Sequence, residues 1–317
     1  MKKIFALTVL AASMAAPAFA QSSVTVYGRL NLTAERQKTD AGSVTNLTNN
    51  SSRIGFKGTE DLGGGLKAFF LIEHGFSPDT GAAASTFWGR ESNVGLEGAF
   101  GKVRLGNMGP TNAYFTTADY ISMHNHDTGT SSDAFYAYPG SAKNMIAYTS
   151  PSLSGLVIDA QFGLKEATQT KNTVVLTGNY DAGPLHLGGT YLTGPGEAKE
   201  FGLRGLYELG AITVGAYYIH NEADVASVTV KRDIYRVSGM YALGASEFHV
   251  NVGAAGKAKA LGIAADGSSA TQYTLGYNYN LSKRTKLYGY YTKVNDGTVK
   301  AYGGDFSSIA AGIRHNF

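Results

Sequence analysis

Apolar and polar residues alternate one by one along many short stretches of this chain. Near the start, Val24, Val26 and Leu30 alternate with polar residues, and near the end Leu275 follows Thr274 in the same way. Successive side chains of a β-strand point to opposite faces, so each stretch predicts a strand with one apolar and one water-facing side. No apolar stripe with the helical period of about 3.6 residues competes after the first twenty residues. The pattern therefore predicts an all-β chain in which Leu275 faces an apolar medium and Thr274 faces water.

The connections between the predicted strands alternate between short and long. Short turns are expected at 61–65, 98–101, 151–155, 181–184, 208–210, 243–246 and 280–284. Longer polar loops are expected at 37–50, 77–86, 107–141, 166–171, 193–199, 221–231, 256–269 and 294–305. Seven short turns and eight long loops would join sixteen strands. This alternation is typical of a bacterial outer-membrane β-barrel, whereas a secreted β-sandwich does not require it.

The longest connection, about 107–141, is rich in aromatic residues. It contains Tyr114, Phe115, Tyr120, Phe135, Tyr136 and Tyr138. A long loop of this composition is expected to pack against something rather than to act as a linker. We therefore predict that it folds into the lumen of the barrel.

The first twenty residues have the three parts of a Sec signal peptide. Lys2 and Lys3 precede an apolar run over 4–16, and a small-x-small site ends at Ala20. The run is too short for a membrane anchor. We expect residues 1–20 to be cleaved and residues 21–317 to form the barrel domain.

Composition excludes several classes of protein. Without the two signal-peptide lysines, 25 basic residues face 24 acidic ones, so the mature net charge is about +1. This balance argues against a broad nucleic-acid interface. The chain has no cysteine, which excludes disulfides, thiol catalysis and cysteine-bound metals.

Six segments span most of the mature chain and carry a family resemblance: SVTVYGRLN, SRIGFKGTEDLGGGLKAFFLIEHGF, FWGRESNVGLEGAFGKVRLG, YTSPSLSGL, YNLSKRTKLYGYYT and AGIRHNF. They resemble the general porins of Gram-negative β-proteobacteria, the family that includes the neisserial and the Burkholderia- or Comamonas-type porins. The resemblance implies a 16-stranded antiparallel transmembrane β-barrel whose third extracellular loop, about 107–141, folds inward. It also implies a homotrimer in the outer membrane that passes ions and small hydrophilic solutes without a catalytic step.

The resemblance implies further partners. These are the lipids and lipopolysaccharide of the outer membrane and the machinery that inserts barrels into it. The terminal aromatic, Phe317, is expected to be the strand-end signal that this machinery reads. No cofactor is implied.

Basic residues are predicted on the water-facing side of the barrel wall. Arg53 and Arg104 alternate with apolar neighbours, and Lys57 shares the face of Arg53. The resemblance places Arg53 and Arg90 at the pore constriction. Arg90 and the apolar Val94 are four residues apart, so in a regular strand both would point to the same face. A bulge or a change of register is therefore expected between them.

The inward loop is expected to offer the opposite charge. Asp119 and Asp127 are its candidate carboxylates, with His124 and His126 between them. Opposite charges across a narrow aqueous gap would set ionic preference, although each acid could instead be a solvated loop residue. Two histidines and one acid are too few for a zinc site, so we expect no metal.

Three functional classes remain open. The first is a general diffusion porin, with a weak anion preference because three pore arginines outweigh the loop acids. The alternative is a substrate-specific outer-membrane channel, which a continuous row of ligand-binding groups along the lumen would distinguish. A barrel enzyme is the third class, but no recognisable Ser/His/acid or paired-acid motif supports it.

Overall fold

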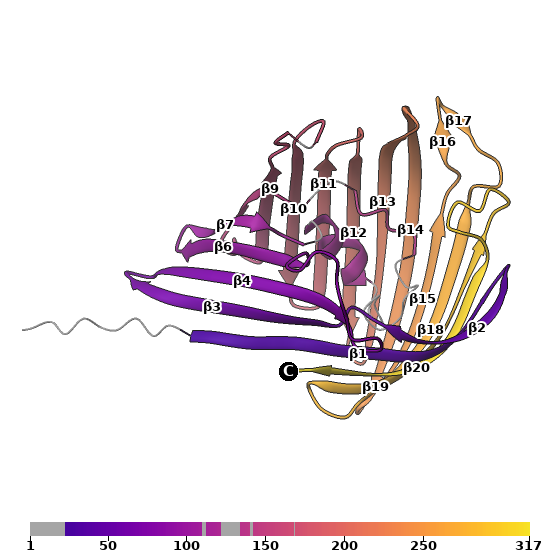
Figure 1. The fold of residues 1–317 in the computed structure, drawn as a ribbon, viewed down its shortest axis with the longest axis horizontal. Coiled ribbons are helices and arrows are strands. Elements are labelled where there is room, and N and C mark those ends of the chain that lie inside the picture. Colours follow the sequence, from indigo (N-terminus) through magenta and orange to yellow (C-terminus); the bar gives the residue numbers. More distant parts are fainter. Residues whose placement is uncertain (1–22, 110–111, 122–133, 140–141, 168) are drawn as a thin grey trace, which may run out of the picture.

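The computed structural model describes residues 23–109, 112–121, 134–139, 142–167 and 169–317. The expected signal peptide, residues 1–20, lies outside these ranges, and its cleavage stays a prediction. Within them, antiparallel strands form one sheet that closes into a barrel (Figure 1). No helix in this part of the chain is long and apolar enough to cross a membrane.

The elements follow one another in a simple order along the chain. The first half contains β1 (Ser23–Thr39), β2 (Gly42–Asn49), β3 (Arg53–Gly63), β4 (Leu66–Ser77), β5 (Ala82–Ala83), β6 (Glu91–Gly98), β7 (Gly101–Asn107), α1 (Asn112–Tyr114), the π-helical turn η1 (Phe115–Asp119), β8 (Met145–Thr149) and β9 (Leu156–Gly163). The second half contains β10 (Thr173–Ala182), β11 (Leu185–Thr193), β12 (Lys199–Leu209), β13 (Ile212–Val225), β14 (Val228–Leu243), β15 (Ser246–Ala255), β16 (Lys259–Ala260), β17 (Ile263–Ala264), β18 (Ala270–Asn280), β19 (Thr285–Asp296) and β20 (Phe306–Asn316).

Strand β1 closes the barrel. One of its edges pairs with β20, and the other pairs with β3 and then with β2, which continues the line of β3 past 50–52. Strands β5, β16 and β17 lie in the connections. Counted in this way, the strands of the described ranges form a closed barrel of sixteen antiparallel strands, as the sequence predicted. Closure pairs neighbouring strands around the described wall, as a membrane-spanning sheet requires, while β2 pairs with β1 alone.

The two faces of the sheet differ as the alternation predicted. Leu275 points outward and is 56% exposed, whereas Thr274 points inward and is 2% exposed. The outward tyrosines at the short-turn end are all more than a third exposed: Tyr148, Tyr180, Tyr207, Tyr241 and Tyr279. Apolar exposed residues with aromatic girdles suit a lipid environment.

Two of the predicted long loops are wrong. The expected loop at 37–50 is the hairpin between β1 and β2, which turns at 40–41. The expected loop at 221–231 is the end of the β13–β14 hairpin, which turns through Ala226 and Ser227, both at positive φ. Strand ends that project beyond the apolar band are polar on both faces, so alternation does not reveal them.

Candidate functional site: the charged pore wall

Glu73 on β4 lies between two arginines on the inward face of the barrel. Arg90 Nε is 2.7 Å from Glu73 Oε1, and Arg53 Nε is 3.6 Å from Glu73 Oε2. The hydroxyl of Tyr27 donates to the same Oε2 at 3.0 Å. One carboxylate therefore contacts two guanidinium groups.

Arg90 reaches Glu73 without the irregularity expected from the sequence. Strand β6 begins at Glu91, which pairs with Glu73, and its register with β4 is unbroken. Arg90 lies just before the strand, so strand alternation does not set its direction, and the expectation of a bulge or register change before Val94 is wrong. Its stem passes over Gly75, where a Cβ atom would be 3.2 Å from Arg90 Cδ.

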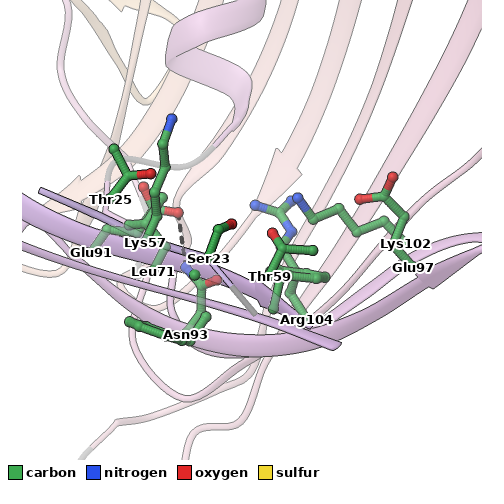
Figure 2. A pocket seen from close by; sticks show the side chains of 13 residues that line it. Ser23, Thr25, Lys57, Thr59, Leu71, Glu91, Asn93, Glu97, Lys102 and Arg104 are labelled. Atoms are coloured by element: carbon green, nitrogen blue, oxygen red, sulfur yellow. Dashed lines mark hydrogen bonds between the residues drawn. The ribbon is translucent and has the colours of Figure 1, made fainter. Parts of the chain in front are cut away.

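A second basic group lines a recess in the same wall. Lys57, Lys102 and Arg104 surround it together with Glu91 and Glu97 (Figure 2). The recess therefore has basic and acidic side chains side by side.

The basic side chains of the recess are held by different partners. Arg104 Nη2 is 3.1 Å from Asp159 Oδ2 on β9. The Nζ atom of Lys102 lies 4.0 Å from the ring centroid of Phe69, and Lys57 Nζ lies 5.3 Å from the centroid of Tyr27. A cation over an aromatic face is attracted by the ring. The wall thus presents basic groups whose orientation is fixed by packing.

Part of the long aromatic connection packs inside the barrel. Helix α1 and η1 contact β10, β11, β12 and β13. Arg204 on β12 is 4% exposed and donates from Nε to the carbonyl oxygen of Thr116 at 2.7 Å. Its Nη2 donates to Asn179 Oδ1 at 2.7 Å, and its Cζ lies 3.4 Å from the ring centroid of Tyr120. Burial raises the pKa of the Tyr120 phenol, although the charge of Arg204 opposes this rise.

Tyr136 makes a second attachment of this connection to the wall. Its hydroxyl donates to Glu200 Oε1 on β12 at 3.1 Å, and both residues are buried. Its ring lies 4.9 Å from that of Tyr114, which joins the two described parts of the connection. Burial, and to a lesser extent the Glu200 carboxylate, raise the pKa of Tyr136 well above its usual range. The phenol therefore stays protonated and remains a donor.

The candidate acidic side of the constriction is only partly within the described chain. Asp119 is the last residue of η1, the turn in which the Thr116 carbonyl oxygen accepts a hydrogen bond from Arg204. His124, His126 and Asp127 lie outside the described residues. Elsewhere in the described chain, no group of three His, Cys, Asp or Glu side chains is placed to hold a metal ion. The roles of these four loop residues in the constriction stay predictions.

Two buried arginines of the inner wall, Arg204 and Arg236, were not predicted from the sequence. Arg204 follows the outward Leu203, which is 50% exposed, and Arg236 lies between outward residues of β14. Arg236 is 1% exposed and donates to Asn251 Oδ1 and Gln272 Oε1. The alternation of inward and outward side chains, which placed Arg53 and Arg104 on the inner wall, would also have placed Arg204 and Arg236 there.

Comparisons with known proteins agree with this architecture. The family model for Gram-negative porin matches residues 6–298. Outer membrane porin protein 32 of Delftia acidovorans is 34% identical over 364 aligned positions, covering 100% of this chain and 99% of the relative. Major outer membrane protein P.IB of Neisseria meningitidis serogroup B is 27% identical over 358 positions, with 100% and 99% covered. The solved anion-selective porin from Comamonas acidovorans superposes with a TM-score of 0.78 at 27% identity, covering 94% of this chain and 100% of that one.

Proposed function

Because the chain belongs to the Gram-negative porin family, it is an outer-membrane channel for ions and small solutes, and we propose that it is a general diffusion pore with a weak anion preference. The observation that carries this proposal is the Arg53–Glu73–Arg90 cluster, in which two guanidinium groups share one carboxylate. The anion selectivity named for the Comamonas acidovorans porin supports it. The pore needs no cofactor and performs no catalytic step.

The sign of the preference follows from local charge. An ion responds to charges within about one Debye length, ~8–10 Å in ordinary salt, and not to the net charge of the protein. The guanidinium groups of Arg53, Arg90 and Arg104 supply the positive field of the inner wall. Asp119 and Asp127 reduce it to the extent that they reach the constriction. We therefore expect a modest preference.

The assembly around the pore is part of the same proposal. We expect residues 1–20 to be removed on export, the barrel of 21–317 to form a homotrimer, and the connection at 107–141 to narrow the pore as the third extracellular loop. Attachment of its described parts to β12 supports this last point. Contacts with lipopolysaccharide and with the insertion machinery follow from the outer-membrane location.

One observation favours a second candidate, a channel specific for amphipathic anions. The recess that contains Lys57, Lys102 and Arg104 also contains Phe69 and Leu71 (Figure 2). Apolar side chains beside cations would retain an anion that carries an apolar group. Saturable block by such an anion at micromolar concentration would favour this candidate over simple diffusion.

Planar-bilayer recordings of the refolded protein test the proposal. We expect large ohmic steps and a reversal potential across a KCl gradient that shows chloride preference. In Arg53→Ala combined with Arg90→Ala, the reversal potential should move toward cations. The control is Lys199→Ala with Lys231→Ala, which removes the same charge from the outward face. Cation preference in the wild type, or no difference between the two double variants, would contradict the proposal.

A further inference from the structure

Four aromatic rings gather on the part of the long connection that lies inside the barrel. Tyr114 and Phe115 belong to α1 and η1, and Tyr136 and Tyr138 belong to the described stretch 134–139. The ring of Tyr114 is central, with centroid distances of 5.3 Å to Phe115, 4.9 Å to Tyr136 and 4.8 Å to Tyr138. The centroids of Tyr136 and Tyr138 are also 4.8 Å apart. We call these four residues the aromatic platform.

The platform has a buried base and an exposed layer. Tyr114 is 1% and Tyr136 is 6% exposed, whereas Phe115 is 43% and Tyr138 is 47% exposed. The base is fixed to the wall, because the Tyr136 hydroxyl donates to Glu200 Oε1 on β12 at 3.1 Å. Both exposed rings contact this base, so they are oriented by ring contacts while much of their surface stays open to water.

The exposed rings face the pore rather than the barrel wall. Thr116 and Ala118, which follow Phe115 in η1, are 4% and 0% exposed and lie against the wall. A Cβ atom at Gly188 on β11 would be 3.0 Å from Thr116 Cγ2. This helical turn lies inside the ring of strands (Figure 1), so the surface that it leaves uncovered meets the water of the pore.

Tyr138 has a backbone conformation that tyrosine rarely adopts. Its φ is 47°, in the left-handed region that favours glycine. Burial of the ring does not account for this conformation, because 47% of the residue is exposed. Strained residues persist where the surrounding structure fixes them, and they cluster at positions that bind ligands. The strain therefore points to a role for the exposed ring in binding.

We infer that the aromatic platform binds the ring of a small aromatic solute on its way through the channel, an inference that rests on the proposed diffusion pore. Aromatic rings attract one another in offset-stacked or edge-to-face geometry, with centroids about 4.5–7 Å apart. Tyr138 meets Tyr114 at an interplanar angle of 35° and Tyr136 at 87°, so the platform already combines tilted and edge contacts. A solute ring against Phe115 and Tyr138 would extend this arrangement and would cover apolar surface that is now in water.

Other occupants gain less from the same surface. An alkyl group would cover apolar surface but would lack the electrostatic attraction between aromatic rings. A cation would be attracted to a ring face, but the guanidinium groups of the inner wall disfavour cations in the proposed pore. The platform therefore selects the aromatic ring of a solute, whereas the charge of the solute is selected by the wall.

Single-channel recordings of the refolded full chain test the platform. The probe is benzoate, compared with cyclohexanecarboxylate, which has the same charge and a six-membered ring that is not aromatic. We expect benzoate to block the current at a concentration about two-fold lower or less, as one aromatic contact implies. Phe115→Leu with Tyr138→Leu should raise the half-blocking concentration of benzoate roughly five-fold or more. The matched control is Tyr191→Leu with Phe201→Leu, a cross-strand pair on the outward face with 49% and 44% exposure, and it should be blocked as the wild type is.

Three outcomes would overturn the platform. They are equal block of the wild type by the two carboxylates, equal loss of benzoate block in the platform and outward variants, and loss of block in Phe69→Leu with normal block in the platform variant. The last outcome would assign binding to the wall recess. If the double variant forms no channels, Tyr138→Leu alone provides the same test. Tyr138→Phe, which keeps the ring, should be blocked as the wild type is.

The same recordings separate the two proposals. Ohmic wild-type channels with unchanged benzoate block in the platform variant refute the platform alone. Failure of the wild type to form channels refutes the diffusion pore.

Discussion

Glu73 is an acid of the pore wall that lies between two arginines. It is the shared partner of Arg53 and Arg90, and it also accepts a hydrogen bond from Tyr27. A glutamine at this position removes one negative charge from beside the two guanidinium groups without adding bulk. Substitution of Glu73 should therefore shift the ion selectivity of the pore toward anions, whereas substitution of Arg53 or Arg90 should shift it toward cations.

For Glu73→Gln we predict a stronger anion preference. A single charge acting over about 8 Å in water contributes roughly 0.5 kcal/mol, so the chloride-to-potassium permeability ratio should rise about two-fold. Reversal potentials across a KCl gradient measure this ratio. Glu222→Gln, which removes an acid from the outward face, is the control and should leave it unchanged. An unchanged ratio for Glu73→Gln would show that Glu73 does not act on the permeating ion, and a fall in the ratio would contradict the predicted sign.

The alternation of apolar and polar residues accounts for which charged side chains could be placed on the inner wall from the sequence. Arg53 and Arg104 were predicted to face inward because their neighbours are apolar, and the structure places both on the inner wall. Parity does not report on Arg90, which lies outside β6. It also does not show that Glu73 is shared, because the pairing depends on the register between separate strands.

At the scale of the element, each strand separates lipid from water along its length. Leu275→Arg places a charge on the outward face of β18, and near the bilayer midplane this should cost about 2–4 kcal/mol. Refolding titrations in lipid vesicles measure the loss of unfolding free energy. The control is Thr59→Arg on β3, an exposed inward position in the wall recess (Figure 2), where the cost should be small. Equal costs at the two positions would mean that the lipid face is assigned incorrectly.

Thr274 shows where alternation alone is insufficient. Its parity predicts a water-facing side chain that tolerates arginine, but it is 2% exposed and its Oγ1 lies 2.7 Å from Thr292 Oγ1. The inner wall is packed at this position, so an arginine has no room there. Periodicity indicates which face a residue occupies and not how crowded that face is.

The connection inside the barrel is an element whose position the sequence could not specify. Its aromatic content predicted packing, but its partners on β12 are far away in the chain. Arg204 joins the two by donating to the Thr116 carbonyl oxygen at 2.7 Å. A charged hydrogen bond of this kind contributes about 1.5–3 kcal/mol, so it is expected to hold η1 against the wall.

For Arg204→Met we predict local loosening of the connection. Amide hydrogen exchange over 113–119 should accelerate at least ten-fold, as the loss of about 1.5 kcal/mol implies, and single-channel recordings should show more frequent partial closures. The control is Arg236→Met, which removes a similarly buried arginine whose hydrogen-bond partners, Tyr217, Asn251 and Gln272, lie on strands. Equal acceleration at 113–119 in both variants would argue against a specific attachment by Arg204.

At the scale of the whole molecule, the number of strands was predictable and the manner of closure was not. Alternation and the regular order of connections predicted sixteen strands, even though two of the connections proved to be hairpins. Closure depends on contacts between the two ends of the chain. The backbone N–H groups of Gly28 and Phe317 donate to each other's carbonyl oxygens, both at 3.1 Å.

Phe317 also closes the barrel through its ring. A Cβ atom at Gly28 would lie 2.4 Å from Phe317 Cζ, so the ring packs directly on the glycine backbone. The side chain points outward at the short-turn end and is 42% exposed. It is therefore placed both to stabilise the β1–β20 seam and to be read by another protein before the seam forms.

For Phe317→Ala we predict a several-fold loss of heat-modifiable barrel in the outer membrane, because insertion of the closing strand is slowed. Two measurements separate recognition from stability. If the aromatic ring acts as the assembly signal, Phe317→Ala should still refold in detergent to a barrel of wild-type conductance, and Phe317→Tyr, which keeps the ring, should restore outer-membrane levels. Failure to refold in detergent would instead assign the defect to the seam with Gly28. Wild-type levels of Phe317→Ala in the outer membrane would exclude both roles, since neither a lost signal nor a weakened seam is compatible with normal assembly.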